Sequence, residues 1–159
     1  MAVGKHWSVA MRNKPALPEN LKLREFQYPN DFAEVIELWK HAGPGIHVRK
    51  SDENEEIKKK VERDPDLFLV AEVDGQIIGT VLGGFDGRRG MVYHLAVDHG
   101  YRQKGIGRFL MNELEKRMAH KGCLRSYLLV TRDNAQAIQF YESSGWEQMD
   151  LLVYGKDLI

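Results

Sequence analysis

The chain has 159 residues and a formal net charge of zero, because 23 Lys and Arg side chains balance 23 Asp and Glu side chains. This length fits one domain, and 43% hydrophobic with 29% charged residues exclude a predominantly disordered protein. The balanced charge argues against a nucleic-acid partner, which usually selects a basic excess. Cys123 is the only cysteine, so a disulfide framework and a cysteine-built zinc site are excluded.

The same features bear on location and domain boundaries. A single cysteine favours a reducing, cytoplasmic setting. Apolar runs such as 67–71 are far shorter than the roughly 20 residues of a membrane span, so we expect no membrane association. Residues 1–20 contain Pro15 and Pro18 and lack periodicity. They are predicted to form an N-terminal arm, with one folded domain over 21–159.

The first third of that domain predicts a strand and a helix. Residues 21–26 are typical of a strand, and apolar positions spaced over 32–39 indicate one face of a helix. Asp31 with Glu34 three residues later resembles a capping box at its start. The helix should end before the Gly-Pro-Gly at 43–45.

The middle of the chain predicts a second helix and a hairpin. Residues 51–64 are acidic first and basic later, which suits the helix dipole, and a proline follows. Strands are expected over 67–73 and 76–83, because Asp74-Gly75 between them is a strong hairpin turn. Another strand is expected over 91–97.

The last third alternates helices with strands. A helix over 106–121 is followed by Gly122 as its cap, then by a strand over 126–131 and a helix from 134 to 144. Two short strands are expected within 146–158. Alternation here and hairpins before it predict an α/β (mixed α+β) fold, a mixed sheet with helices on its faces.

The segment 101–108 joins a strand to a helix and contains three cations and two glycines: Arg102, Lys104, Arg108, Gly105 and Gly107. Cations at a helix N-terminus are unfavourable unless an anion lies among them. The glycines let backbone N–H groups approach a ligand closely, as in phosphate sites. A solvated basic turn is the alternative interpretation. Neither the Walker pattern nor the dinucleotide fingerprint is present.

A second informative stretch is 134–146. Taken alone, Asn134 could be only a helix cap, and Phe140 and Tyr141 only core residues. Together, the two stretches resemble the GNAT superfamily of N-acetyltransferases over about residues 21–158. The acetyl-CoA signature is matched by Arg102, Gly105 and Gly107, and the second signature by Asn134, Ala137, Phe140, Tyr141, Gly145 and Trp146. Segments 68–73 and 79–87 are similar to its small bacterial YpeA-like subgroup.

The resemblance implies a GNAT fold: a mixed, mostly antiparallel sheet of about seven strands, splayed between the fourth and fifth and flanked by about four helices. It implies acetyl-CoA as cosubstrate, with the pyrophosphate on backbone N–H groups of Gln103, Lys104, Gly105, Ile106, Gly107 and Arg108. It further implies that the main chain of Leu95, Ala96 and Val97 pairs with the pantetheine arm, which Asn134 also hydrogen-bonds.

The resemblance also implies direct attack of a neutral amine on the thioester, with Tyr141 as proton donor to the leaving thiolate. A backbone N–H near Val97 could stabilise the oxyanion. Met91 and Leu129 occupy places where some relatives carry a glutamate base, so no base carries over. Tyr93 and His94 are candidates, although strand alternation should place them on opposite faces. Glu72 and a water chain remain alternatives.

Two further functions stay open beside the acetyltransferase. One is a non-catalytic acyl-CoA-binding sensor or assembly module, and the other is a nucleic-acid binder using Arg102–Arg108. The loop containing His41, His47 and Asp52 is expected to line the acceptor side, without metal-ligand spacing, so we expect no metal. The amine acceptor stays unidentified (small molecule, peptide N-terminus or lysine), and a homodimer is compatible with the sequence.

Overall fold

The computed structural model describes residues 16–159, so most of the predicted arm 1–20 lies outside the described residues. The strands are β1 (Leu21–Glu25), β2 (Phe68–Val73), β3 (Gln76–Phe85), β4 (Gly90–Val97) and β5 (Ser126–Leu128). The helices are α1 (Phe32–Lys40), α2 (Asn54–Arg63), α3 (Ile106–His120) and α4 (Ala135–Ser143), with short 3-10 turns η1 (Lys50–Asp52) and η2 (His99–Tyr101). The α/β class and the four helices are confirmed.

The strands form one sheet in the order β1-β2-β3-β4-β5. The first four are antiparallel to their neighbours and β5 runs parallel to β4, as expected for a mixed, mostly antiparallel sheet. The hairpin turn between β2 and β3 is confirmed: Asp74 and Gly75 adopt φ values of +50° and +79°. This pair of left-handed residues matches the twist of the flanking strands.

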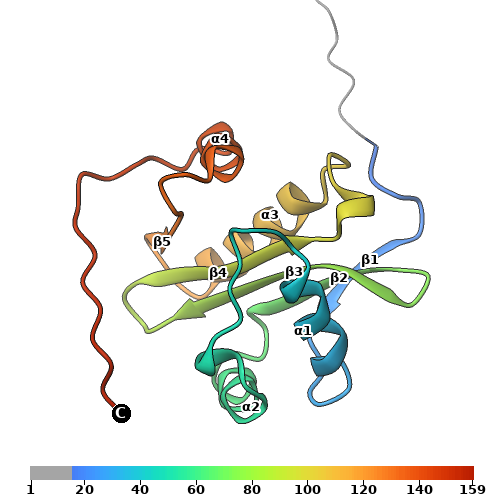
Figure 1. Cartoon of the computed structure of the whole chain (residues 1–159), viewed down its shortest axis with the longest axis horizontal. Helices are drawn as coiled ribbons and strands as arrows, with labels where there is room; N and C mark the ends of the chain where they lie inside the picture. The colour runs from blue at the N-terminus through green and yellow to red at the C-terminus, as the bar shows by residue number, and fades with distance from the viewer. Residues whose placement is uncertain (1–15) are drawn as a thin grey trace, which may run out of the picture.

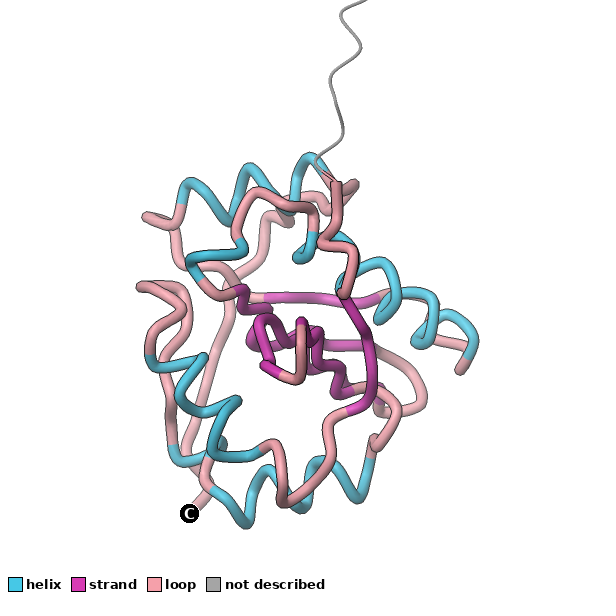
Figure 2. The backbone as a smooth tube through the Cα atoms, turned by 90° about the vertical axis from the view of Figure 1, so that its right-hand side faces the viewer, coloured by secondary structure: helices cyan, strands magenta, loops and turns pink. Residues whose placement is uncertain are grey.

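Helices cover both faces of the sheet (Figures 1 and 2). α1 and α2 pack on one face through a core that includes Trp39, Ile57 and Phe68. α3 packs on the other face through Leu110 and Leu114. Successive residues of β2 therefore enter different cores, which explains why its sequence is almost continuously apolar.

The predicted capping box at the start of α1 is wrong. The Asp31 side chain makes no cap hydrogen bond to its helix. It instead accepts two hydrogen bonds from the Arg24 guanidinium, at 2.6 and 3.0 Å, and one from the backbone N–H of Gln27. Glu34 accepts a hydrogen bond from the backbone N–H of Ile77 at 2.7 Å. Partners outside the helix thus replace the local helix partners, because they offer a charged donor from β1 and a backbone amide at the start of β3.

We expect Arg24→Met to lower the free energy of unfolding at pH 7 by about 3 kcal/mol, because it leaves a buried carboxylate without its cation. Burial raises the pKa of Asp31, but its hydrogen bonds from Arg24 and Gln27 outweigh this, and the net pKa is lowered. The stabilisation is therefore present above the ordinary Asp pKa of about 3.9 and is lost as the pH falls through the folded-state value. Urea unfolding of both proteins from pH 7 to pH 3 should show the difference shrinking; a constant difference would contradict it.

The sheet has five strands within the described residues, not about seven, because the two strands expected within 146–158 are absent. This segment leaves α4 and runs extended along one side of the molecule (Figure 1). Leu151, Leu152 and Val153 are more than 60% exposed. Strand-like residues form a strand only beside a partner. β5, the nearest open edge, is only three residues long rather than the six expected.

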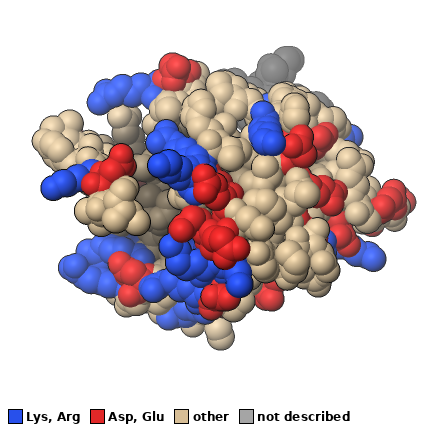
Figure 3. Space-filling model, turned by 60° about the horizontal axis from the view of Figure 1, so that its bottom comes forward, with Lys and Arg blue, Asp and Glu red and all other residues tan. Residues whose placement is uncertain are grey.

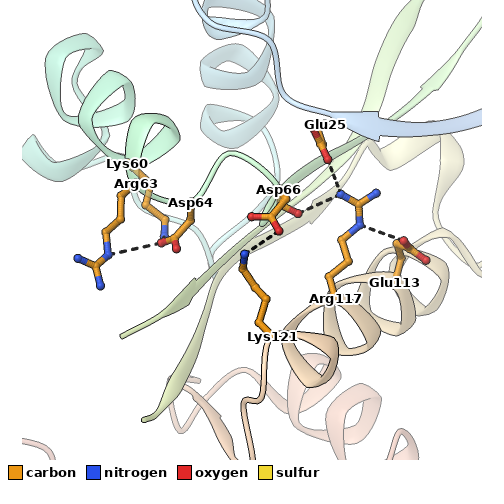
Figure 4. A network of polar contacts seen from close by, with 8 residues as sticks. All are labelled: Glu25, Lys60, Arg63, Asp64, Asp66, Glu113, Arg117 and Lys121. Carbon is orange, nitrogen blue, oxygen red and sulfur yellow. Dashed lines mark hydrogen bonds and ion pairs between the residues drawn. The ribbon is translucent and has the colours of Figure 1, made fainter. Parts of the chain in front are cut away.

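Polar contacts join the C-terminal half of α3 to the end of β1 and to the residues just before β2 (Figure 4). Arg117 donates to Glu25 at the end of β1 and to the carbonyl of Asp66, at 2.7 and 3.0 Å. Lys121 pairs with the Asp66 carboxylate at 2.8 Å. These contacts fix the direction of α3, and therefore the place where its N-terminus meets β4.

The surface carries charges of both signs. On the face seen in Figure 3, Lys and Arg side chains are interspersed with Asp and Glu. Among residues 16–159, no helix is both long and apolar enough to cross a membrane.

Candidate active site

A cavity of about 1910 Å³ opens where β4 and β5 separate. The two strands pair only from Gly90 to Val92 and from Ser126 to Leu128, so the described strands leave Tyr93–Val97 without a partner on that side. The expected splay between the fourth and fifth strands is therefore present. The walls come from the α1–α2 loop, α2, β4, the start of α3, the end of β5 and α4.

A β-bulge in β4 marks the point where the strands part. Thr80 pairs with Ala96 but Leu82 pairs with Tyr93, so β4 has one extra residue there. His94 lies in this bulge with φ +44°, a left-handed conformation that is uncommon outside glycine. Tyr93 and His94 both line the cavity. The expectation of opposite faces is wrong, because a bulge interrupts strand alternation.

His94 is held by residues from both neighbouring layers. Its Nε2 lies 2.9 Å from Oδ1 of Asp52, which is 4% exposed at the end of η1. Its ring lies 4.4 Å from the ring of Trp39 on α1, centroid to centroid, at 47°. Thr80 accepts a hydrogen bond from Trp39 Nε1 at 2.8 Å and donates one to the His94 carbonyl at 3.4 Å. The imidazole therefore has a fixed orientation in the cavity wall.

The Asp52 carboxylate is ionised in this setting. Burial raises its pKa, but hydrogen bonds from His94 and from the backbone N–H of Arg49 outweigh the burial, so the pKa is lowered. From the sequence, Asp52 was predicted only to lie in the loop on the acceptor side. No local pattern links it to His94, which is 42 residues away along the chain.

The other carboxylates of the cavity wall have close partners. Glu56 pairs with Lys59, Asp64 pairs with Lys60, and Asp86 accepts from two backbone N–H groups of the β3–β4 turn. Glu72, an alternative base in the sequence, is bound to Arg24 at 3.0 Å and does not line the cavity. Met91 and Leu129 do line it and supply no titratable group.

The turn before α3 has the geometry of an anion site. Gln103 and Gly105 adopt φ values of +60° and +81°, and Gly105 is the N-cap residue of α3. The N–H groups of the first helical turn, from Ile106 onward, have no intrahelical acceptor. They carry the positive end of the helix dipole, which favours a phosphate.

The basic side chains of this turn do not all converge on one point, as the sequence suggested. The Arg102 guanidinium binds the carbonyls of Ala42 and Val97, so it ties the α1–α2 loop to the end of β4. Arg108 contacts the hydroxyl of Ser143 at 3.3 Å. Lys104 is exposed and does not line the cavity. Arg102 and Arg108 thus line the cavity while each is hydrogen-bonded to another part of the protein.

α4 forms the opposite wall with Asn134, Ala137 and Tyr141. Asn134 Oδ1 caps the helix by accepting from the backbone N–H of Ala137 at 3.2 Å. Its Nδ2 lies so near Gly45 that a Cβ there would approach it to 2.6 Å. The α1–α2 loop therefore reaches across the cavity to α4.

Tyr141 is largely buried between aromatic rings. Its ring lies 5.2 Å from that of Phe140 and 6.2 Å from that of Trp146, in edge-on geometry. Burial raises the pKa of its phenol to about 12. No hydrogen bond of this hydroxyl to another described residue is found within 16–159. The phenol is therefore protonated at neutral pH and available as a donor.

Three sequence-predicted groups thus meet in one cavity: the turn before α3, the exposed edge of β4, and Tyr141. Of the predicted site residues, these line it: Tyr93, His94, Leu95, Ala96, Val97, Arg102, Gln103, Gly105, Ile106, Gly107, Arg108, Asn134, Ala137 and Tyr141. No group of three or more His, Cys, Asp or Glu side chains in the described part of the chain is placed to hold a metal ion. Cys123 lies outside the cavity, near the carbonyl of Arg125.

Comparisons with known proteins agree with this geometry. The profile of the acetyltransferase (GNAT) family matches residues 32–146. An acetyltransferase of Yersinia pestis is 41% identical over 139 residues, which cover 87% of this chain and 96% of the relative. An acetyltransferase of Sodalis glossinidius is 41% identical over 140 residues, again 87% and 96%.

Solved structures agree as well. The chain is similar to a PaiA N-acetyltransferase from Thermoplasma acidophilum, solved in complex with coenzyme A. The TM-score is 0.71 at 25% identity, covering 82% of this chain and 92% of that one. The arrangement of strands and helices described above is therefore shared with a coenzyme A complex.

Proposed function

Because the chain belongs to the acetyltransferase (GNAT) family, we propose that it is an N-acetyltransferase that moves the acetyl group of acetyl-CoA to a primary amine. One observation carries this proposal. A single cavity joins an anion-binding turn, an unpaired strand edge and a buried, protonated tyrosine. These three features match the diphosphate, the amide-bearing arm and the thioester of acetyl-CoA, in that order.

The proposed binding mode uses backbone groups for most of the cofactor. The diphosphate lies on the N–H groups from Gln103 to Arg108, where the helix dipole favours negative charge. The pantetheine arm adds to the open edge of β4 at Leu95–Val97, as a peptide strand adds to a sheet edge. Asn134 lies on the facing wall, where its amide nitrogen can donate to the arm.

The proposed chemistry is direct attack within one ternary complex. The amine nitrogen bonds to the thioester carbon while the carbon–sulfur bond breaks, and holding both substrates together supplies much of the acceleration. His94 accepts the proton that the amine loses. Tyr141 donates a hydrogen bond and then its proton to the departing sulfur. Burial disfavours a bare thiolate in this cavity and so favours its protonation, whereas the same burial disfavours the phenolate, so Tyr141 takes up a proton again from solvent once CoA has left.

We expect acetyl-CoA to raise the melting temperature of the protein. At a concentration of about 100 times its Kd, ligand linkage adds about 2.7 kcal/mol, which for a chain of this size is roughly 5–10 °C. Differential scanning fluorimetry measures the shift. No shift at millimolar acetyl-CoA would contradict cofactor binding.

Two matched glycine variants test whether the acetyl-CoA-induced rise in melting temperature depends on the turn before α3. Gly105 in the turn and Gly87 in the β3–β4 loop have φ values of +81° and +95°, so alanine strains the backbone at both. Gly105→Ala should weaken the acetyl-CoA shift, whereas Gly87→Ala should retain it. An amine and peptide screen for free thiol then tests turnover. If no amine or peptide releases thiol although acetyl-CoA raises the melting temperature strongly, the non-catalytic acyl-CoA-binding module is favoured.

A further inference from the structure

We propose that Asp52 is a positioning residue for catalysis: its carboxylate holds His94 in the Nε2–H tautomer and leaves Nδ1 as the atom that takes the proton of the amine. The inference rests on the proposed function, because it gives His94 the role of base. It adds the residue that makes this role possible, from a segment far from β4 in the sequence.

The geometry fixes which ring nitrogen carries the proton. Asp52 Oδ1 lies 2.9 Å from His94 Nε2, and Oδ2 accepts from the backbone N–H of Arg49 at 2.9 Å. An ionised carboxylate only accepts hydrogen bonds, so Nε2 must be the donor. In the neutral imidazole, Nδ1 then bears the lone pair. No hydrogen bond of Nδ1 to the described part of the protein is found.

The surroundings also hold the imidazole ring in place. The ionised Asp52 lies against one edge of the ring, and the Trp39 ring lies 4.4 Å from it. Trp39 is itself held by Thr80, so the ring cannot easily turn away. The α1–α2 connection that carries Asp52 passes in front of β4 in Figure 1.

The other titratable groups of this part of the cavity do not replace Asp52. Glu56 on α2 pairs with Lys59, at 2.6 Å. Tyr93 beside His94 has its pKa raised by burial, so it is protonated at neutral pH. Tyr141 on α4 is likewise protonated. Asp52 is thus the carboxylate that touches His94.

A purely structural role for Asp52 is the competing explanation. Its bond to the Arg49 N–H closes the η1 turn, and loss of that bond could disturb the loop by itself. Asp52→Asn keeps a carbonyl oxygen for the Arg49 N–H and nearly the same shape. It removes the charge and lets an amide N–H donate to Nε2. The variant therefore separates the two roles.

Nitrogen NMR of the His94 ring, recorded at alkaline pH without substrates, is the first test. We expect the Nε2–H tautomer in the parent protein and a shift toward Nδ1–H in Asp52→Asn. An Nδ1–H tautomer in the parent, or no change in the variant, would overturn the proposal. This readout needs no turnover, so it stands even if no acceptor amine is found and the proposed function fails.

Kinetics with an accepted amine are the second test. Asp52→Asn should lower kcat about 10–100-fold, as expected for a partner that orients a reactive group, with little change in the KM for acetyl-CoA. In a His94→Asn background the same change should have no further effect. Equal losses in both backgrounds would show that Asp52 acts independently of His94, and would overturn the assignment.

Asp31→Asn is the matched control. Asp31 is also a buried carboxylate, 7% exposed, but it binds Arg24 and does not line the cavity. This variant should lower the melting temperature without changing the His94 tautomer or kcat at a temperature where it is folded. If it reproduces the Asp52→Asn loss, destabilisation explains both and the proposal fails.

Discussion

Tyr141→Phe should lower kcat about 10²–10⁴-fold, the usual contribution of a positioned general acid, while the Kd of acetyl-CoA stays nearly unchanged. The ring keeps its contacts with Phe140 and Trp146, because only the hydroxyl is removed. Stopped-assay thiol release and a thermal shift with acetyl-CoA measure the two quantities separately. A variant as fast as the parent would remove Tyr141 from the mechanism.

The pH dependence gives this prediction a second readout. Burial raises the pKa of Tyr141 to about 12, so the proton-donating form persists throughout the neutral and mildly alkaline range. The parent should therefore show no alkaline loss of kcat from Tyr141 below about pH 10. Tyr154→Phe is the control, because Tyr154 is 88% exposed and lies outside the cavity. It should match the parent at every pH.

His94→Asn should lower kcat/KM for the amine about 10²–10⁴-fold, because asparagine cannot accept and hold the proton. Asparagine is the appropriate replacement, since His94 has φ +44° and asparagine tolerates left-handed backbone better than most residues. Alanine at this position would combine loss of the base with strain. Initial rates across amine concentrations measure the effect, and circular dichroism checks the fold.

Tyr93→Phe decides between the two bases predicted on β4. Tyr93 is 44% exposed, and burial of its remainder raises its pKa, so its anion is scarce at neutral pH. We expect kcat/KM to change little. If Tyr93→Phe is the slow variant and His94→Asn is not, the tyrosine is the base. The proposed role of Asp52 in positioning His94 for catalysis is then wrong.

Local features were predictable from sequence because their causes are local. Asp74-Gly75 makes a hairpin turn through its own left-handed backbone. The turn before α3 takes its shape from a left-handed glycine N-cap and leaves the first N–H groups of one helix without intrahelical acceptors. Both depend on a few consecutive residues, so composition and spacing suffice. The cavity beside the turn before α3 exists because β4 and β5 pair over only three residues and then separate.

Errors arose where a distant partner overrode a local preference. Asp31 binds Arg24 of β1 instead of capping α1. Arg102 binds the carbonyl of Ala42, 60 residues away, instead of pointing with Lys104 at an anion. The strands expected within 146–158 did not form, because a strand needs a neighbouring edge as well as suitable residues.

The sequence by itself determined the four helices, the first five strands, the glycine turn before α3 and the place of Tyr141 on a helix, since each is set mainly by backbone preferences within one or two turns of chain. Only the tertiary structure decided which carboxylate meets His94. That contact joins η1 to a bulge in β4, and a bulge depends on the register between two strands and not on either strand alone. The register between two strands cannot be predicted from the residues of either strand alone. A contact that depends on it, such as that of Asp52 with His94, is therefore found only in the folded structure.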